Sequence, residues 1–236
     1  MWIYLYFQNK SMINMIFNFK QITNQNSIHD DESIKYFSNL AFNSKENILL
    51  DIIVDTLQLD NEENRRQYLF EIKEYYHNKG VVFDDIEFER QVDNFLSKNI
   101  GNVKGAFLEV LIYKLIQSYC NHDGLYKECI ISNNNNHPYD IVTIINDIAH
   151  LIDIKFSCHH LKKIHLDYLL EYVNENNFKS YLLSLDSFSK INDKLHYIQY
   201  ENNISDNDFH FITTNITFIS NNDIYDAIMN QNCLMN

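Results

Sequence analysis

The chain has 236 residues, of which 45% are hydrophobic and 22% charged, and this suffices for one large domain or for a core domain with an added helical part. Its formal net charge of −13 argues against a protein that coats nucleic acid by bulk attraction, but it leaves room for an enzyme with a local basic groove around a divalent cation. No window approaches the roughly 18 apolar residues of a membrane span, so we expect no membrane partner.

The cysteines and the first twenty residues indicate in which cellular compartment the protein is expected. Cys120, Cys129, Cys158 and Cys233 form no CxxC pair and no zinc-binding spacing, so we expect reduced thiols in an intracellular, cytoplasmic protein. Residues 1–20 are aromatic, but Gln, Asn, Lys and Ser interrupt them and a small-residue cleavage site is lacking. We therefore expect no signal peptide.

Residues 1–100 predict a mainly helical N-terminal region of unassigned role. Residues 1–43 show no periodic pattern, whereas from residue 46 apolar residues recur at helical spacing, first in ENILLDIIVDTLQL. We predict three helices over 46–100, with a turn at 77–80. These helices carry no catalytic signature, and a DNA-contacting helical module is the functional alternative.

The pattern changes at residue 101 and predicts an α/β domain over 101–236. The segment GNVKGAFLEVLIYKLIQSY predicts a strong helix, and three strand-like runs follow it. The runs are YKECIIS (126–132), YDIVTII (139–145) and HLIDIKFS (150–157). The last two are separated only by Asn146-Asp147, which is typical of a tight hairpin turn.

The remaining elements complete a mixed β-sheet flanked by helices. Helical spacing returns after the third strand, further strand-like runs follow, and a short helix closes the chain. We predict a helix over 160–176, strands over 181–186, 195–201 and 209–219, and a helix within 222–230.

Charged residues interrupt two of these apolar strands. Asp140 stands at the start of the run 139–145, and Asp153 and Lys155 stand in the run 150–157. Charged groups are costly to bury unless they are paired or bind a metal. Residues two apart on a strand share a face, and neighbouring strands lie about 4.8 Å apart. A carboxylate from each strand can therefore reach one hard cation, Mg²⁺ or alternatively Mn²⁺, with the lysine beside it.

The order of these residues resembles the PD-(D/E)XK nuclease signature. Pro138-Tyr139-Asp140 is followed thirteen residues after the aspartate by Asp153-Ile154-Lys155, with a tyrosine inserted after the proline and Asp in place of the commoner Glu. Members of that superfamily share a mixed sheet flanked by helices, and a glutamate often comes from the helix before the motif. Glu109, within GAFLEVLIYKL, matches that glutamate. The resemblance covers about residues 101–220.

The resemblance implies a restriction-endonuclease-like fold and Mg²⁺-dependent hydrolysis of phosphodiester bonds, foremost in DNA, of a restriction, defence or repair type. Glu109, Asp140 and Asp153 would hold the metal, and Lys155 would assist the attacking water. RNA as the substrate and a homodimer as the assembly stay open. So do two other interpretations: a catalytically inactive nucleic-acid-binding module of the same fold, and a structural or interaction protein with a coincidental motif.

Each site residue also has a structural interpretation. Lys155 and Asp153 could form a plain ion pair on the surface. Asp140 could cap a turn, and Glu109 could be a solvated side chain of its helix.

The segment CHHLKKIH (158–165) follows the Asp-Ile-Lys strand directly. Its histidine spacing matches no known zinc site. We predict that His160, Lys162 and Lys163 form a local basic surface for the phosphate backbone, with His160 also a candidate to complete the catalytic site. The alternative is a plain solvated helix start.

Overall fold

The computed structural model describes residues 20–21, 28–44, 47–80, 84–131, 138–175 and 177–229. The chain divides into two compact units, one of residues 25–115 and the other of residues 1–24 with 116–236. The boundary falls inside a helix, α6 (Ile100–Tyr119), whereas the sequence pattern placed it at residue 100. An α/β fold with a helical N-terminal region is confirmed.

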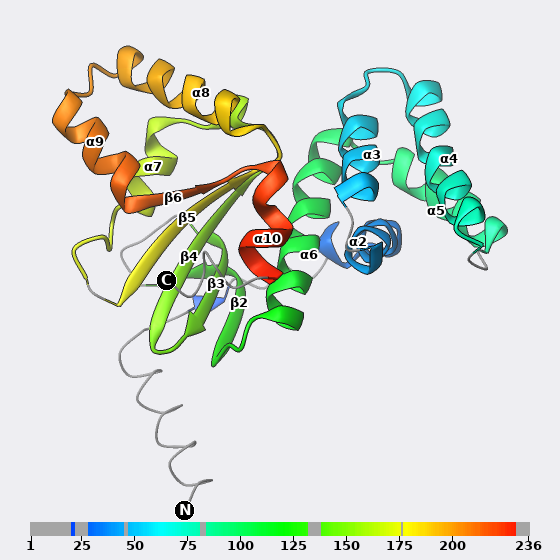
Figure 1. Ribbon diagram of the computed structural model, residues 1–236, viewed down its shortest axis with the longest axis horizontal. Coiled ribbons are helices and arrows are strands. Elements are labelled where there is room, and N and C mark those ends of the chain that lie inside the picture. The colour runs from blue at the N-terminus through cyan, green and yellow to red at the C-terminus, as the bar shows by residue number, and fades with distance from the viewer. Residues whose placement is uncertain are drawn as a thin grey trace, which may run out of the picture. The chain divides into compact units, whose positions relative to one another are not determined.

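The unit of residues 25–115 is built from helices. Those predicted over 46–100 are present, and another lies before them (Figure 1). The helices are α2 (Glu32–Ser44), α3 (Asn47–Gln58), α4 (Glu62–Asn78), α5 (Asp85–Leu96) and the first part of α6.

Helix α2 has no counterpart among the predicted elements, because serine shares its buried side. Ile34, Phe37 and Ala41 are fully buried at helical spacing. Ser38 is fully buried with them, and its hydroxyl donates to the carbonyl oxygen of Phe107 at 3.2 Å. This bond satisfies the buried hydroxyl, so a polar residue occupies a core position that a hydrophobic pattern does not reveal.

The other unit is organised around a six-stranded mixed sheet whose spatial order follows the chain. The strands up to β4 pair antiparallel, and β4, β5 and β6 pair in parallel. The strands are β1 (Lys20–Gln21), β2 (Gly124–Ile130), β3 (Tyr139–Ile145), β4 (Ile148–Lys155), β5 (Phe178–Ser184) and β6 (Ile216–Ile219). The predicted mixed sheet is confirmed.

The turn between β3 and β4 consists of Asn146 and Asp147, as the sequence predicts. Both residues have positive φ, 52° and 64°, and Ile145 pairs with Ile148 directly beyond them. Two consecutive left-handed residues define the type I′ turn, whose twist matches that of the flanking strands, and Asn and Asp tolerate this conformation. The turn thereby fixes the β3–β4 register.

Helices α7 (Lys163–Leu169), α8 (Phe188–Glu201) and α9 (Asp206–Asn215) cover one face of this sheet, and α10 (Ile224–Met229) lies on the other side (Figure 1). The first three helices contribute Leu166, Ile191 and Ile212 to a core that includes Leu151 and Leu182 of the strands. None of the helices in the described part of the chain has the length and apolar character needed to cross a lipid bilayer.

Two predicted strands are wrong. Residues 195–201 belong to helix α8, and residues 209–215 belong to helix α9, with only 216–219 forming a strand. Tyr197 and Tyr200 have high β-propensity, but they are 50% and 83% exposed, and the buried residues Ile191, Leu195 and Ile198 follow helical spacing. The helix predicted over 160–176 is also too long, since α7 ends at Leu169.

A polar pair is buried on the sheet face opposite to α7. His150 of β4 is 1% exposed, its ring stacks on that of Tyr181 at 5.5 Å, and its Nδ1 lies 3.1 Å from the tyrosine hydroxyl. Burial lowers the pKa of His150 to about 4, and the charge of Lys179 on the adjacent strand contributes. The imidazole is therefore neutral in the folded protein at pH 7.

This neutral histidine should make the protein acid-sensitive. Between its ordinary pKa of 6.5 and about 4, the unfolded chain binds a proton that the folded chain does not, so stability falls as the pH falls. Between pH 7 and pH 4 the free energy of unfolding should therefore fall by roughly 3 kcal/mol on account of this histidine. Urea denaturation of His150→Gln, which keeps an acceptor for Tyr181 but does not titrate, should show a correspondingly weaker pH dependence.

His196→Gln, on the exposed side of α8, is the matched control and should retain the wild-type pH dependence. An unchanged pH dependence in His150→Gln would contradict the assignment of acid sensitivity to this residue.

Candidate active site

Asp140, Asp153 and Lys155 lie on one face and at one end of the sheet. The β3–β4 pairing ends with Ile141 opposite Ile152, so the next residues outward, Asp140 and Asp153, face each other across the two strands. Side chains directly opposite in a sheet share a face, and so do residues two apart on one strand. The structure therefore brings together the three residues that the hairpin spacing selects.

Asp140 is held in place by the backbone of the neighbouring strand. Its Oδ2 accepts the N–H of Ile154 at 2.6 Å. A hydrogen bond from a backbone N–H to a carboxylate is charge-assisted and so among the stronger ones in proteins. This contact directs the Asp140 carboxylate toward β4, on the side where Asp153 and Lys155 emerge.

Lys155 is the cation between the two carboxylates. Its Nζ lies 2.7 Å from Oδ1 of Asp153 and 4.0 Å from Oδ2 of Asp140. The side chains are mostly buried, with 17% of Lys155, 22% of Asp140 and only 5% of Asp153 exposed. Interactions between charges are strong in such a poorly solvated place, and the ammonium partly neutralises two acids that would otherwise repel each other.

The second oxygen of Asp153 has no hydrogen-bond partner in the described part of the chain. Oδ2 is buried, and only Oδ1 receives the lysine. A buried carboxylate oxygen without a donor costs about 1–3 kcal/mol or more. Such an oxygen beside a second carboxylate is a donor set that suits a hard divalent cation, which takes one or two carboxylates and completes its shell with water or phosphate.

Two carboxylates, rather than three, make up this donor set. Among the described residues, no group of three or more His, Cys, Asp and Glu side chains is placed to hold a metal. Glu109, the third ligand implied by the resemblance, belongs to the unit of residues 25–115. Its Oε2 lies 2.6 Å from Nε2 of His29, at ion-pair distance. Its role as a ligand stays a prediction.

His165, which was not among the predicted site residues, lies beside this site. A small pocket is lined by Asp153, His165 and Tyr168, together with Tyr139, whose hydroxyl donates to the Tyr168 carbonyl oxygen at 2.8 Å. His165 Nδ1 accepts the backbone N–H of Lys162 at 3.1 Å, which leaves a neutral ring with its proton on Nε2. The sequence placed His165 on a helix but gave no sign that this helix folds back over Asp153.

The predicted basic segment follows β4 as a 3-10 turn, η2 (Cys158–His160), and the start of α7. His160 and Lys162 are exposed. Lys163 differs from them, because its ammonium contacts both carboxylate oxygens of Asp167 at 2.7 Å. His160 and Lys162 are therefore the two members of the predicted surface whose side chains reach solvent without such a pairing.

Asp186 anchors this segment to the sheet. Its Oδ2 accepts the hydroxyl of Ser157 at 2.8 Å and the N–H of Cys158 at 2.7 Å. Burial alone would raise the pKa of Asp186, but hydrogen bonds from Cys158 and Ser157 and the charge of Lys190 lower it below its ordinary value. An ionised, buried Asp186 thus fixes the path of the chain directly after Lys155.

No family model and no curated protein matches the sequence. Solved structures resemble it remotely. One is the Vibrio cholerae protein VC1899, with a TM-score of 0.46 and 12% identity over 94% of this chain and 60% of that one. Another is Can2 from Sulfobacillus thermosulfidooxidans in complex with cyclic tetra-adenylate, with a TM-score of 0.44 and 14% identity over 90% and 55% of the two chains. The chain thus spans less than two thirds of their length.

Because Asp153 is buried, replacing Lys155 should destabilise the folded protein more than replacing Asp153. Lys155→Met leaves a buried carboxylate without a counter-ion and should lower the free energy of unfolding by about 3–5 kcal/mol. Asp153→Asn should cost less, since the lysine can extend toward solvent, and the double variant should recover part of the loss. Urea denaturation in EDTA measures all three.

Lys163→Met is the matched control, because the Lys163–Asp167 pair has the same 2.7 Å distance but is 42% and 48% exposed. Its loss should cost less than about 1 kcal/mol. Equal costs for Lys155→Met and Lys163→Met would show that Asp153 is solvated and would remove the electrostatic basis of the site.

Proposed function

We propose that this protein is a metal-dependent nuclease of the PD-(D/E)XK type that hydrolyses phosphodiester bonds, foremost in DNA. One observation carries the proposal: Asp153, which faces Asp140 across the strand pair, has a buried Oδ2 without a hydrogen-bond partner in the described part of the chain, while Lys155 contacts its other oxygen. A purely structural Asp–Lys pair gives no reason to bury the second oxygen without a donor. A divalent cation supplies that reason.

Asp140 and Asp153 would hold the cation, Mg²⁺ or alternatively Mn²⁺. Such a cation, when bound, polarises the phosphate and makes a coordinated water more acidic. The Ile154 N–H keeps the Asp140 carboxylate oriented, so the ligand position does not have to be organised when the cation arrives. Glu109 is the further ligand that the resemblance implies.

Lys155 would act at the reacting phosphate. Its ammonium is within 4.0 Å of both carboxylates, so it lies next to the place where phosphate oxygens would complete the metal shell. A cation at this place stabilises charge that develops on the phosphate and orients the attacking water. The same group partly neutralises the two aspartates when no metal is bound.

Contacts to the rest of the substrate would come from the chain after β4. His160 and Lys162 are exposed there, and Asp186 fixes this segment relative to the strand. Contacts of this kind position a phosphate backbone without reading base sequence. These basic contacts to the substrate are few, which agrees with the net charge of −13. Few contacts to phosphates predict that binding depends only modestly on the salt concentration. RNA is the alternative substrate.

Cleavage assays test the proposal directly. The wild-type protein with Mg²⁺ or Mn²⁺ should cleave at least one member of a panel of single-stranded DNA, double-stranded DNA and RNA, and EDTA should stop it. Asp153→Asn and Lys155→Met should each lower the rate about 100-fold or more, since they remove a metal ligand and a charge that stabilises the transition state. Asp193→Asn, an exposed acid on α8, is the control and should cleave normally.

Two outcomes count against the proposal. Cleavage that survives in both site variants would place the activity elsewhere or in a contaminant. A wild-type protein that binds the panel but cleaves none of it with either metal would favour the inactive nucleic-acid-binding alternative.

Metal binding has a readout that does not depend on cleavage. Mg²⁺ should raise the melting temperature of the wild-type protein, because a ligand that binds only the folded state stabilises it. Asp153→Asn should lose this response, whereas Asp193→Asn should keep it. A response of equal size in Asp153→Asn would exclude this carboxylate as a ligand.

A further inference from the structure

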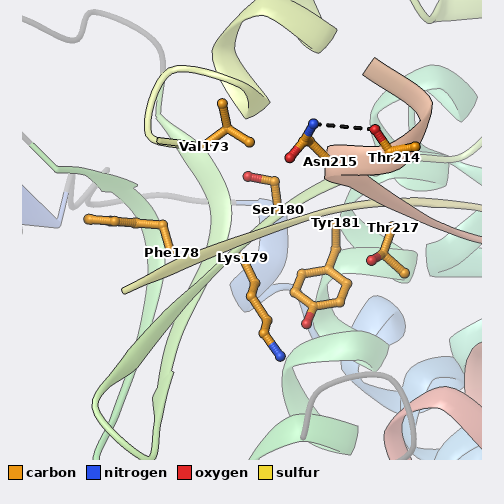
Figure 2. A pocket seen from close by; sticks show the side chains of 8 residues that line it. All are labelled: Val173, Phe178, Lys179, Ser180, Tyr181, Thr214, Asn215 and Thr217. Atoms are coloured by element: carbon orange, nitrogen blue, oxygen red, sulfur yellow. Dashed lines mark hydrogen bonds between the residues drawn. The ribbon is translucent and has the colours of Figure 1, made fainter. Parts of the chain in front are cut away.

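A second hollow in the sheet unit lies away from the Asp153 end. It has a volume of about 270 Å³ and is formed where β5 and β6 begin, next to the end of α9 (Figure 2). Lys179 on β5 pairs in register with His150, whereas Ser184 on the same strand pairs with Lys155. Five residues of strand, roughly 16 Å at 3.3 Å per residue, separate the two positions.

Lys179 also points to the face of the sheet opposite to that of Asp153. Asp153 pairs with Leu182, which shares its face, and Lys179 is an odd number of residues away on the alternating strand. A molecule bound beside Lys179 would therefore not touch the proposed catalytic carboxylates. The proposed nuclease activity therefore does not account for this hollow.

The lining of the hollow is polar and contains no acid. Lysine, hydroxyl and amide side chains contribute most of it, from Lys179, Ser180, Tyr181, Thr214, Asn215 and Thr217. The chain as a whole has 32 Asp and Glu against 19 Lys and Arg. A hollow whose described lining holds one cation and no carboxylate is thus unusual for this protein and favours an anionic ligand.

Lys179 lacks a counter-ion. Among the described residues it forms no ion pair, whereas lysines such as Lys73, Lys155 and Lys163 each contact a carboxylate. The hydroxyl of Thr217 likewise has no hydrogen-bond partner in this part of the structure. Tyr181 and Thr217 pair in register on β5 and β6, and Lys179 is two residues from Tyr181, so the three side chains share a face. Figure 2 shows them on the same side of the two strands.

The opposite wall of the hollow adds an amide and a hydroxyl. Asn215 and Thr214 end helix α9 just before β6 begins, and Figure 2 shows them across the strands from Lys179. Both groups already form hydrogen bonds within α9, the Asn215 amide to the carbonyl oxygen of Phe211 and the Thr214 hydroxyl to that of His210. The charge and the donor offered to a ligand therefore come from Lys179 and Thr217, and an ammonium beside a hydroxyl suits the oxygens of a phosphate.

We propose that this hollow binds a small phosphorylated molecule, with the phosphate group beside Lys179 and Thr217. The volume of about 270 Å³ is large enough for a compact phosphate monoester. The site is independent of the proposed nuclease activity, because it lies at the other end of the strands and Lys179 points to the other face.

Isothermal titration with glycerol 3-phosphate, at ionic strength kept constant with chloride, tests the proposal. The wild-type protein should bind it saturably, and Lys179→Met should weaken the affinity about tenfold or more, the cost of losing a charge-assisted hydrogen bond. Thr217→Val, an isosteric change at an exposed residue, should weaken it less. Lys194→Met on α8 is the control lysine and should leave binding unchanged.

Two further measurements complete the test. Glycerate, the carboxylate analogue of the probe, should bind more weakly, and the His150 and Tyr181 resonances in NMR spectra should shift on addition of glycerol 3-phosphate. The absence of saturable binding, an unchanged affinity in Lys179→Met, or equal affinity for glycerate would each overturn the proposal. Melting temperatures of the variants confirm that a loss of binding is not a loss of folding.

Discussion

The register of the β3–β4 hairpin is the constraint on which the proposed site depends. Asn146 and Asp147 both adopt positive φ, and the two-residue turn that they form sets Ile145 against Ile148. The same register puts Asp140 opposite Asp153 at the far end of the two strands. A slip of one residue would turn one of the two aspartates to the other face of the sheet and would also move the buried β4 side chains to the face against which they are not packed. The register that packs the side chains of the two strands is therefore also the one that brings Asp140 and Asp153 together.

The second constraint is electrostatic. Asp153 is almost fully buried at the end of an apolar strand, next to another acid, and Lys155 is the one ammonium that the described residues place there. Lys155 relieves part of the cost, and the remaining cost is concentrated on Oδ2 of Asp153. An arrangement that leaves a carboxylate oxygen unsatisfied weakens the folded protein without benefit unless the oxygen binds something. The proposed divalent metal would account for the position of all three residues.

Much of this unit could be predicted from the sequence, because its strands are short, apolar and bounded by clear turn residues. The strand 139–145, the turn at Asn146 and the helix before the sheet follow from local patterns. Exposed aromatic residues produced the main errors, since Tyr197 and Tyr200 suggest a strand although they lie on the outer side of helix α8.

Other features depend on contacts between distant parts of the chain, which no local pattern contains. The placement of His165 beside Asp153 results from the path of the chain after η2, and the anchoring of that path by Asp186 joins residues about 28 apart. The lack of a counter-ion for Lys179 likewise becomes visible only when β5 and β6 are placed side by side. Residue types and spacing could indicate the Asp, Asp and Lys set, but not which of its oxygens would be left without a partner.

The central claim is that Asp140 and Asp153 share one divalent cation. Anomalous diffraction from crystals soaked in MnCl₂ tests it most directly, because Mn²⁺ scatters anomalously and shares the oxygen-ligand preference of Mg²⁺. The account predicts an anomalous peak bonded to oxygens of both aspartates, including Oδ2 of Asp153, with Lys155 moved away from that carboxylate or turned toward solvent. Crystals that bind Mn²⁺ only at other places, with the Lys155–Asp153 contact unchanged, would contradict it.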